Sequence, residues 1–295
     1  MSFVCRAGVF CIMSNHDHEL QQLQDFLARH PKIVVLSGAG ISASSGIATY
    51  RDGEGRWLYS TPIQHRDFLQ EASVRQRYWT RSWFGWPTVR DARSNAAHRA
   101  LATLEQRGMV NLVITQNVDR LHQRAGSHAV IDLHGRLDRV VCLNCSAFSA
   151  REVLQQRLGH ANPHLAAHPR SLQQRPDGDM ALPDALAANT HVPVCEDCGG
   201  TLKPDVVFFG GNVPSERVAH SHEAIRQADA LLVIGSSLQV YSGFRFCRSA
   251  HAQGKPLVIV NPGQTRADSL ATLKLAAPCE ALLEALVSTV PCLPA

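Results

Sequence analysis

The fold is decided by residues 33–42, which read IVVLSGAGIS. Four β-branched or aliphatic residues come first, and such a run bounded by glycine is typical of a strand buried on both faces of a parallel sheet. Gly38 and Gly40 then let the backbone turn sharply and approach a ligand closely. Ser42 is of a type that caps helices and binds phosphate. Because Gly46 comes later than the third glycine of a G-x-G-x-x-G fingerprint, an ordinary strand–turn–helix connection stays open as the alternative.

The composition of the 295-residue chain is that of a soluble globular protein. Its hydrophobic content of 45% and charged content of 18% fit a sizeable core and allow one large or two modest domains. A net charge of +4 is too small to indicate nucleic acid, and no apolar run approaches the ~20 residues of a membrane span. Residues 1–18 are expected to form a tail without a signal-peptide or transit-peptide pattern, and Met13 is an alternative start.

Apolar runs alternate with helical patterns along most of the chain. This alternation predicts a Rossmann-like α/β fold, a doubly wound parallel sheet with helices on both faces. Polar residues follow several of the runs, and open α/β sheets bind ligands at these carboxyl ends of their strands. Further strands are expected at 111–115, 130–133, 206–209, 231–234 and 257–260, and helices at 18–30, 96–106, 215–228 and 243–253.

Two segments interrupt this rhythm. Residues 53–87 contain all four tryptophans, which predicts a helical layer over the sheet with some rings at a pocket mouth. Residues 141–203 begin and end near a cysteine pair and are rich in Gly, Pro, His and Gln. We therefore expect a discontinuous Rossmann-like domain at 19–54, 91–140 and 203–290, a helical and aromatic layer at 55–90, and a zinc-binding small domain at 141–202.

The two C-x-x-C pairs are the strongest local signal. Four thiolates from two such turns hold Zn²⁺ tetrahedrally at about 2.3 Å and leave no open position, so the ion is expected to be structural. Non-ligating cysteines and a redox dithiol are the alternatives, and neither explains two pairs. An odd total of nine cysteines favours a reducing compartment over disulfides. The predicted ligands are Cys142, Cys145, Cys195 and Cys198.

Three polar residues at predicted strand ends are candidates for chemistry. His134 follows an apolar strand and precedes Gly135, where a neutral imidazole can act as a general base near pH 7. A buried core histidine is the alternative. Asn117 and Asp119 follow the run 111–115, and helix capping is the alternative for both.

These features together resemble the Sir2 (sirtuin) family of NAD-dependent protein deacylases. The resemblance covers about residues 20–286, and finer features are similar to the class II group, which includes a mitochondrial sirtuin. The motifs that carry it are GAGIS at 38–42, YR at 50–51, TQNVD at 115–119, LHG at 133–135, the cysteine pairs, GSSL at 235–238 and VNP at 260–262.

The resemblance implies an enzyme that transfers an acyl group from lysine to ADP-ribose and releases nicotinamide, with NAD as co-substrate and one structural Zn²⁺. It implies His134 as the general base and Asn117 as the residue that positions ribose hydroxyls and a water. The acylated-lysine protein substrate would pair as an added strand with Val207, Phe208, Phe209 and Gly210. The implied NAD contacts are Gly38, Ala39, Gly40, Ile41, Ser42, Ile47, Tyr50, Arg51, Gln116, Asn117, Asp119, Gly235, Ser236, Ser237, Asn261, Pro262, Gly263 and Cys279.

Two other functions stay open. A protein mono-ADP-ribosyltransferase would use the same NAD site with a different acceptor. A zinc-bearing module that senses NAD without turnover would need no general base. We expect a bacterial, cytoplasmic monomer that acts on acylated proteins, without nucleic-acid or membrane partners.

The preferred acyl group is not decided by the sequence. Tyr78 and Arg81 have the Tyr-x-x-Arg spacing with which some sirtuins of another class bind an acyl carboxylate. The favoured interpretation is that Tyr78 belongs to the core and Arg81 is a solvated charge on a helix. Ala48 and Gly211 also depart from the family pattern, where proline and an acidic residue are usual.

Overall fold

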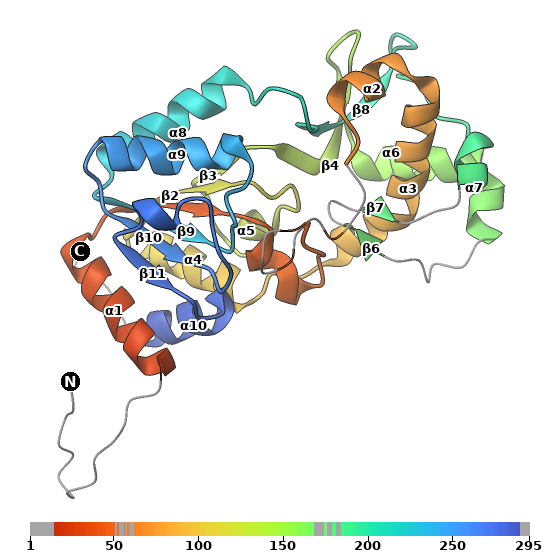
Figure 1. Ribbon diagram of the computed structural model, residues 1–295. Coiled ribbons are helices and arrows are strands. Elements are labelled where there is room, and N and C mark those ends of the chain that lie inside the picture. The colour runs from red at the N-terminus through yellow and green to blue at the C-terminus, as the bar shows by residue number, and fades with distance from the viewer. Residues whose placement is uncertain are drawn as a thin grey trace, which may run out of the picture.

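Strand β1 (Ile33–Ser37) lies inside a six-stranded parallel sheet with the order β11-β10-β9-β1-β2-β3 (Figure 1). All five residues of β1 are buried, and the strand pairs in parallel with β2 on one side and β9 on the other, which confirms the strand expected from the sequence. The computed structural model describes residues 15–50, 52, 56, 58, 62–167, 174–175, 179–180 and 184–289. The other strands are β2 (Val110–Thr115), β3 (Val130–Asp132), β9 (Ala230–Ile234), β10 (Leu257–Val260) and β11 (Leu273–Leu275).

Helices cover both faces of this sheet. One core unites β1 with α1 (Asn15–Arg29), α4 (Ala96–Gln106) and α10 (Cys279–Thr289). A second core, on the opposite face, includes residues of α8 (Ser215–Gln227) and α9 (Tyr241–Ala252). Both cores are aliphatic, so burial of apolar side chains holds the layers together. None of the described helices combines the length and the apolar character needed to cross a membrane.

The small module is built on a three-stranded antiparallel sheet with the order β5-β4-β8. Its aromatic core contains the fully buried Trp79 together with Phe68 and Tyr78, so most of the predicted aromatic layer packs on this module. The elements are α2 (His65–Gln70), α3 (Ala72–Asp91), β4 (Gly135–Cys142), β5 (Phe148–Ala150), α6 (Arg151–Ala161), β6 (Gln174–Arg175), β7 (Asp179–Met180), α7 (Asp184–Ala188) and β8 (Leu202–Val206). Short elements complete the fold: η1 (Ala39–Ser45), α5 (Leu121–Arg124), η2 (Pro163–Ala167) and η4 (Asp268–Leu270).

Four expectations differ from the structure. The strand expected at 206–209 in the Rossmann-like sheet is wrong, because β8 covers 202–206 and pairs with β4 of the small module. The module boundaries move with it, since β4 already begins at Gly135. Helix α1 begins at Asn15, inside the expected tail. Strand β11 and helix α10 were not expected, and they complete one edge and one face of the sheet.

Candidate active site

A cavity of about 530 Å³ lies at the carboxyl ends of the parallel strands. Parallel strands end at one edge of a sheet, so the loops after β1, β2, β3, β9 and β10 meet there. The segment after β8 closes the cavity from the small module. The cavity thereby brings together most of the predicted site residues: Gly38, Ala39, Gly40, Tyr50, Gln116, Asn117, His134, Val207, Phe208, Phe209, Gly210, Gly235, Ser236, Ser237, Asn261, Pro262 and Gly263.

A second, much smaller cavity of about 10 Å³ adjoins the first. Its lining includes Ser42, Ile47 and Asp119, which do not line the main cavity, and it shares Tyr50 and Asn117 with the main cavity. The structure therefore joins these predicted residues to the same site through a side pocket.

Two glycine turns lie in direct contact at one side of the main cavity. The Gly40 amide donates to the Gly235 carbonyl at 2.8 Å, and Gly235 has a left-handed φ of +58°. A Cβ atom on Gly235 would lie 2.4 Å from the amide nitrogen of Ile41, and one on Gly40 would lie 2.8 Å from the Gly235 oxygen. Only glycine allows the two main chains to come this close. The cavity surface beside them is formed by main-chain atoms and by Ser237. Such main-chain amides and hydroxyls are the donors that bind phosphate groups.

A buried polar network lies beneath the side pocket. The Asn117 amide donates to the Gly38 carbonyl at 3.1 Å and to the Ser42 hydroxyl at 3.0 Å. Ser42 donates in turn to Asp119 at 2.7 Å, and the other Asp119 oxygen accepts from the Leu121 amide at 2.9 Å. Burial raises the pKa of Asp119, and the bonds from Leu121 and Ser42 oppose that rise by stabilising the carboxylate. Asn117 and Asp119 thus hold the turn after β1, and Asp119 also binds the first amide of α5, as the capping alternative expects for that residue.

His98 supports this network from behind, a role that no sequence motif indicates. Its Nε2 lies 3.4 Å from the Ser42 hydroxyl, and the ring is fully buried on α4. Burial lowers the pKa of His98 to about 4, so the ring is neutral and adds no charge beside Asp119. The Asn95 cap of α4 contacts the His98 ring, which fixes its place.

His134 is held at both ring nitrogens. Its Nδ1 lies 2.9 Å from the Gln116 carbonyl, which only accepts, so Nδ1 carries the proton and Nε2 carries the lone pair. The Ser242 hydroxyl donates to Nε2 at 2.7 Å. Burial lowers the pKa of His134 to about 4; the Gln116 bond raises it, and the positive charges of Arg217 and Arg245 lower it further. The imidazole is therefore neutral at neutral pH, as a general base must be.

Of the remaining predicted NAD contacts, some line the cavity and others lie behind it. Asn261 lines the cavity and its side chain donates to the Gly263 carbonyl at 2.9 Å, which shapes the loop after β10. Cys279 begins α10, does not line the cavity, and its sulfur lies 4.0 Å from the Gly40 carbonyl. Ile41 is buried beneath the cavity in the core. Arg51 lies outside the described residues.

The segment at 207–210 forms the wall opposite α9. The Val207 amide donates to the His134 carbonyl at 2.7 Å, so this wall is fastened directly to the histidine. Phe209 forms a parallel bridge with Gln64 and lies 5.9 Å from the Tyr50 ring between centroids. The small module therefore contributes one complete side of the cavity.

Tyr78 and Arg81 do not act as a pair in the cavity. Tyr78 is buried against Phe68 and Phe208 and lines the cavity, which agrees with the core interpretation. Arg81 does not line the cavity and donates to the Met180 carbonyl at 2.9 Å. It is half-buried rather than solvated, because it ties α3 to the hairpin between the cysteine pairs. Among the described residues, the cation that lines the cavity is Arg245, which belongs to none of the motifs quoted above.

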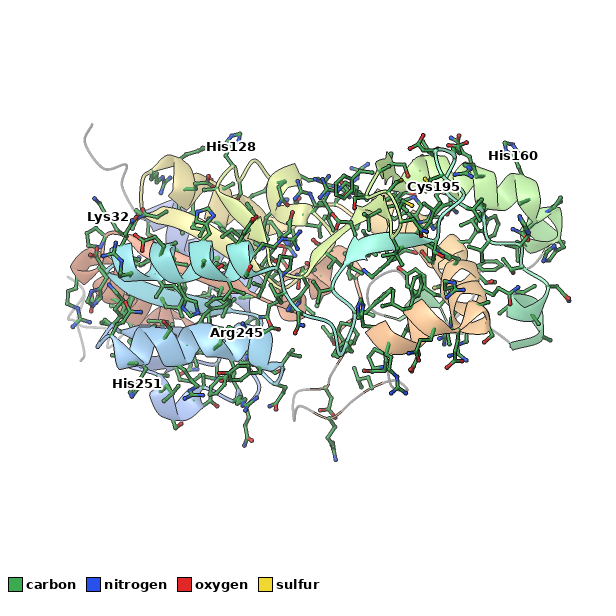
Figure 2. All side chains as sticks on the ribbon, turned by 90° about the horizontal axis from the view of Figure 1, so that it is seen from above. Lys32, His128, His160, Cys195, Arg245 and His251 are labelled. Atoms are coloured by element: carbon green, nitrogen blue, oxygen red, sulfur yellow. The ribbon has the colours of Figure 1, made fainter. Side chains whose placement is uncertain are left out.

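The four predicted metal ligands form one cluster in the small module. Their sulfur atoms all lie within 4.8 Å of one another, with 3.5 Å between Cys142 and Cys198 and 3.8 Å between Cys145 and Cys195. A tetrahedron of sulfurs about 2.3 Å from a central Zn²⁺ has edges of about 3.8 Å, so the cluster fits the ion. Figure 2 shows Cys195 in the small module, well away from Arg245 on α9, which agrees with a structural ion.

A glycine-lined cavity at the strand ends of a Rossmann-like sheet, with a neutral histidine inside it, belongs to the class of nucleotide-using enzymes. The Sir2 family model matches residues 38–242. The "NAD-dependent protein deacetylase 2" of Bradyrhizobium diazoefficiens is 51% identical over 92% of this chain and 98% of that protein. This chain belongs to the Sir2 family.

Two further similarities refine the comparison. Human "NAD-dependent protein lipoamidase sirtuin-4, mitochondrial" is 46% identical over 90% of this chain and 85% of that protein. Sirtuin-4 is a class II sirtuin, so the class II resemblance is confirmed. The solved structure described as "Sir2-p53 peptide-NAD+" has a TM-score of 0.74 and 31% identity, and covers 91% of this chain and 97% of that chain.

Proposed function

We propose that this protein is an NAD-dependent protein-lysine deacylase in which His134 is the general base. It releases nicotinamide and transfers the acyl group to ADP-ribose. The reaction class rests on membership of the Sir2 family and on relatives named NAD-dependent protein deacetylase. The observation that carries the proposal is the neutral His134 ring, whose Nε2 lone pair faces the cavity wall at Ser242.

The two glycine turns would hold the pyrophosphate of NAD, with Ser236 and Ser237 beside it. The adenosine ribose would be held at the far end by Asn261, Pro262 and Gly263. Cys279 and Ile41, which do not line the cavity, would support the NAD-binding residues from the core. This assignment is supported by the close approach of the Gly40 and Gly235 main chains, which a Cβ atom on either glycine would disturb.

The nicotinamide end would lie in the main cavity at the mouth of the side pocket, which at about 10 Å³ has room for no more than a water molecule. Asp119 and Ile47 line that pocket, and Tyr50 lines both cavities, so it would cover the reacting ribose. NAD, when bound, supplies a ribose carbon that loses nicotinamide and ribose hydroxyls that take up the acyl group. Gln116 and Asn117 would orient the hydroxyls, and His134 Nε2 would accept the proton that a hydroxyl gives up. Arg51 belongs to the same proposal by resemblance alone.

The acylated lysine would enter along the wall formed by Val207, Phe208, Phe209 and Gly210. Solved Sir2 structures hold a propionylated peptide and an acetylated peptide, which supports acyl-lysine as the substrate class. The wall is joined to the His134 carbonyl through Val207, so a peptide bound there reaches the base. We propose that it adds as a strand to this segment.

Replacing Gly235 with alanine tests the pyrophosphate site. The new Cβ would meet the Ile41 amide at 2.4 Å, and the left-handed φ would cost a further 1–2 kcal/mol or so. We expect NAD affinity, measured by calorimetry, to fall by at least about tenfold, or about 1.4 kcal/mol. Gly254→Ala is the matched control, because Gly254 has a similar φ of +67° with no atom within 4 Å of its Cβ position. Equal NAD affinities in both variants would contradict the assignment.

Replacing Arg81 with methionine tests the acyl-pocket alternative. Because Arg81 binds a main-chain carbonyl outside the cavity, we expect its loss to change kcat/KM for acetyl and succinyl peptides by the same factor. The ratio of the two values, measured on one peptide sequence, is the readout. A selective loss on the succinyl peptide, by about 1.5–3 kcal/mol in transition-state binding, would restore the Tyr-x-x-Arg pair.

Product analysis separates deacylation from mono-ADP-ribosyl transfer. The protein is incubated with NAD and acetylated peptide, and the products are identified by mass. Free nicotinamide together with O-acyl-ADP-ribose supports deacylation, whereas ADP-ribose fixed to protein supports the transferase. If no nicotinamide is released in this incubation, the result would support the NAD-sensing module. His134 favours an enzyme, because a sensor needs no buried neutral base.

We propose a cytoplasmic location in a bacterium and a monomeric state. Four of the cysteines that the structure describes form the predicted metal site, and Cys247 and Cys279 are free thiols, which supports a reducing compartment. Many of the similar proteins are bacterial deacetylases. Light scattering on the purified protein tests the monomer directly, and a molar mass near twice 32.3 kDa would contradict it.

A further inference from the structure

The Ser242 hydroxyl occupies the nitrogen atom that the proposed base uses. His134 Nδ1 donates to the Gln116 carbonyl, so Nε2 has one lone pair in the ring plane and no proton. Ser242 donates to that lone pair at 2.7 Å. A proton that leaves a ligand in the cavity therefore reaches Nε2 either through the Ser242 oxygen or after the Ser242 side chain has turned away.

Ser242 is fixed in this position by its surroundings. It lies in the first turn of α9 and lines the cavity together with His134. The next residue, Gly243, packs so closely on Gln116 that a Cβ there would lie 2.4 Å from the Gln116 side-chain oxygen. Gln116 is the same residue whose carbonyl holds Nδ1 of His134. The start of α9 and the base are thus fastened to one residue.

We propose that Ser242 is a catalytic residue that relays the proton from the substrate hydroxyl to His134. A serine hydroxyl has one donor hydrogen and two acceptor lone pairs, so it can accept from one group while it donates to another. In the relay, the ribose O–H bond breaks as its proton moves to the Ser242 oxygen. The original Ser242 proton moves to Nε2 at the same time. The ribose oxygen keeps the electron pair and attacks the acyl carbon, and His134 becomes the imidazolium. This inference rests on the proposed function.

The competing interpretation is a cap. In that case Ser242 only covers Nε2 in the resting enzyme, and the ligand displaces it. The two interpretations predict opposite effects of removing the hydroxyl, because a relay residue is needed for the reaction whereas a cap obstructs it.

The kinetic experiment compares Ser242→Ala with Ser242→Thr. We expect Ser242→Ala to lower kcat by about 10- to 100-fold, within the range of general-base effects, with little change in KM for NAD. Ser242→Thr keeps a hydroxyl and should recover most of the loss. Ser249→Ala is the matched control, because Ser249 lies on the same helix and contacts another histidine, His222, at 3.0 Å. Ser249 does not line the cavity. The control therefore shows what the loss of a serine–histidine contact on α9 does when that contact lies outside the site.

A second measurement does not depend on turnover. In protein labelled with ¹⁵N-histidine, the Nε2 resonance of His134 reports whether the lone pair accepts a hydrogen bond. The relay predicts that this bond is absent in Ser242→Ala and stays absent when ADP-ribose is added, because the ribose hydroxyl then has no serine oxygen through which to reach Nε2. The cap predicts that ADP-ribose restores the bond in Ser242→Ala, because the ribose hydroxyl then donates to Nε2 directly.

Each outcome has a distinct meaning. An unchanged or faster kcat in Ser242→Ala, or an Nε2 hydrogen bond restored by ADP-ribose in that variant, would overturn the relay and leave the deacylase proposal intact. Full activity in His134→Ala would instead overturn the base itself. If Ser242→Ala does not fold, the same two measurements are made on Ser242→Gly, which also lacks the hydroxyl.

Discussion

Replacing His134 with alanine is expected to lower kcat about 10²–10⁴-fold while NAD still binds. The reason is that His134 is the neutral, half-buried imidazole of the cavity, oriented by the Gln116 carbonyl so that Nε2 is free of a proton. Steady-state kinetics with an acetylated peptide give kcat, and calorimetry gives the NAD affinity. His128→Ala is the control, because His128 is exposed and lies outside the cavity (Figure 2). Near-normal turnover of His134→Ala would show that another group is the base.

The pH dependence offers a check on the same residue. An exposed histidine has an ordinary pKa of 6.5, and burial lowers the pKa of His134 to about 4. The neutral form is the base, and a lowered pKa keeps it neutral to lower pH. The acid limb of kcat/KM, which reports the free enzyme, is therefore expected near pH 4 rather than near 6.5. A limb near 6.5, in protein that circular dichroism shows to be folded, would mean that the ring is hydrated in the free enzyme.

Removing the zinc is expected to have the largest effect on stability. The four cysteines close one tetrahedral site between the β4–β5 turn and the turn before β8, so the ion joins two segments about fifty residues apart in sequence. Binding of structural Zn²⁺ contributes about 10–16 kcal/mol of apparent free energy in small zinc domains. We expect chelation, or Cys142→Ser, to unfold the small module and to abolish activity, because that module supplies the wall at 207–210.

Elemental analysis and thermal unfolding measure this prediction. Protein purified without chelator should contain one zinc per chain, and Cys142→Ser should contain far less and unfold at lower temperature. Cys247→Ala is the control for zinc content, since Cys247 is a free thiol buried in the core of the larger sheet. Well under one zinc in the unsubstituted protein would contradict a structural ion.

Much of the larger sheet and of the zinc site is encoded locally. The run at 33–36 is apolar because β1 is buried on both faces, so its role is visible without knowing its neighbours. Helix α4 follows its predicted bounds because an amphipathic pattern records which face meets a sheet. The cysteine spacing predicts the cluster because two short turns each fix a pair of ligands.

Other features depend on partners that are distant in sequence. The apolar run at 206–209 reads as a strand of the larger sheet, yet β8 pairs with β4, and local periodicity does not name the partner of a strand. Arg81 has the spacing of a carboxylate-binding residue, but its guanidinium donates a hydrogen bond to the Met180 carbonyl, which is distant along the chain.

The sequence by itself determined the family, the four clustered cysteines and the candidate base, because these are carried by residue types at short, fixed spacings. Only the tertiary structure decided what surrounds the base. Ser242 reaches His134 from a helix more than a hundred residues away, and His98 supports Ser42 from the opposite side of β1. Such contacts follow from how helices dock on a sheet, and docking depends on the packing of the whole core rather than on any one stretch of the chain.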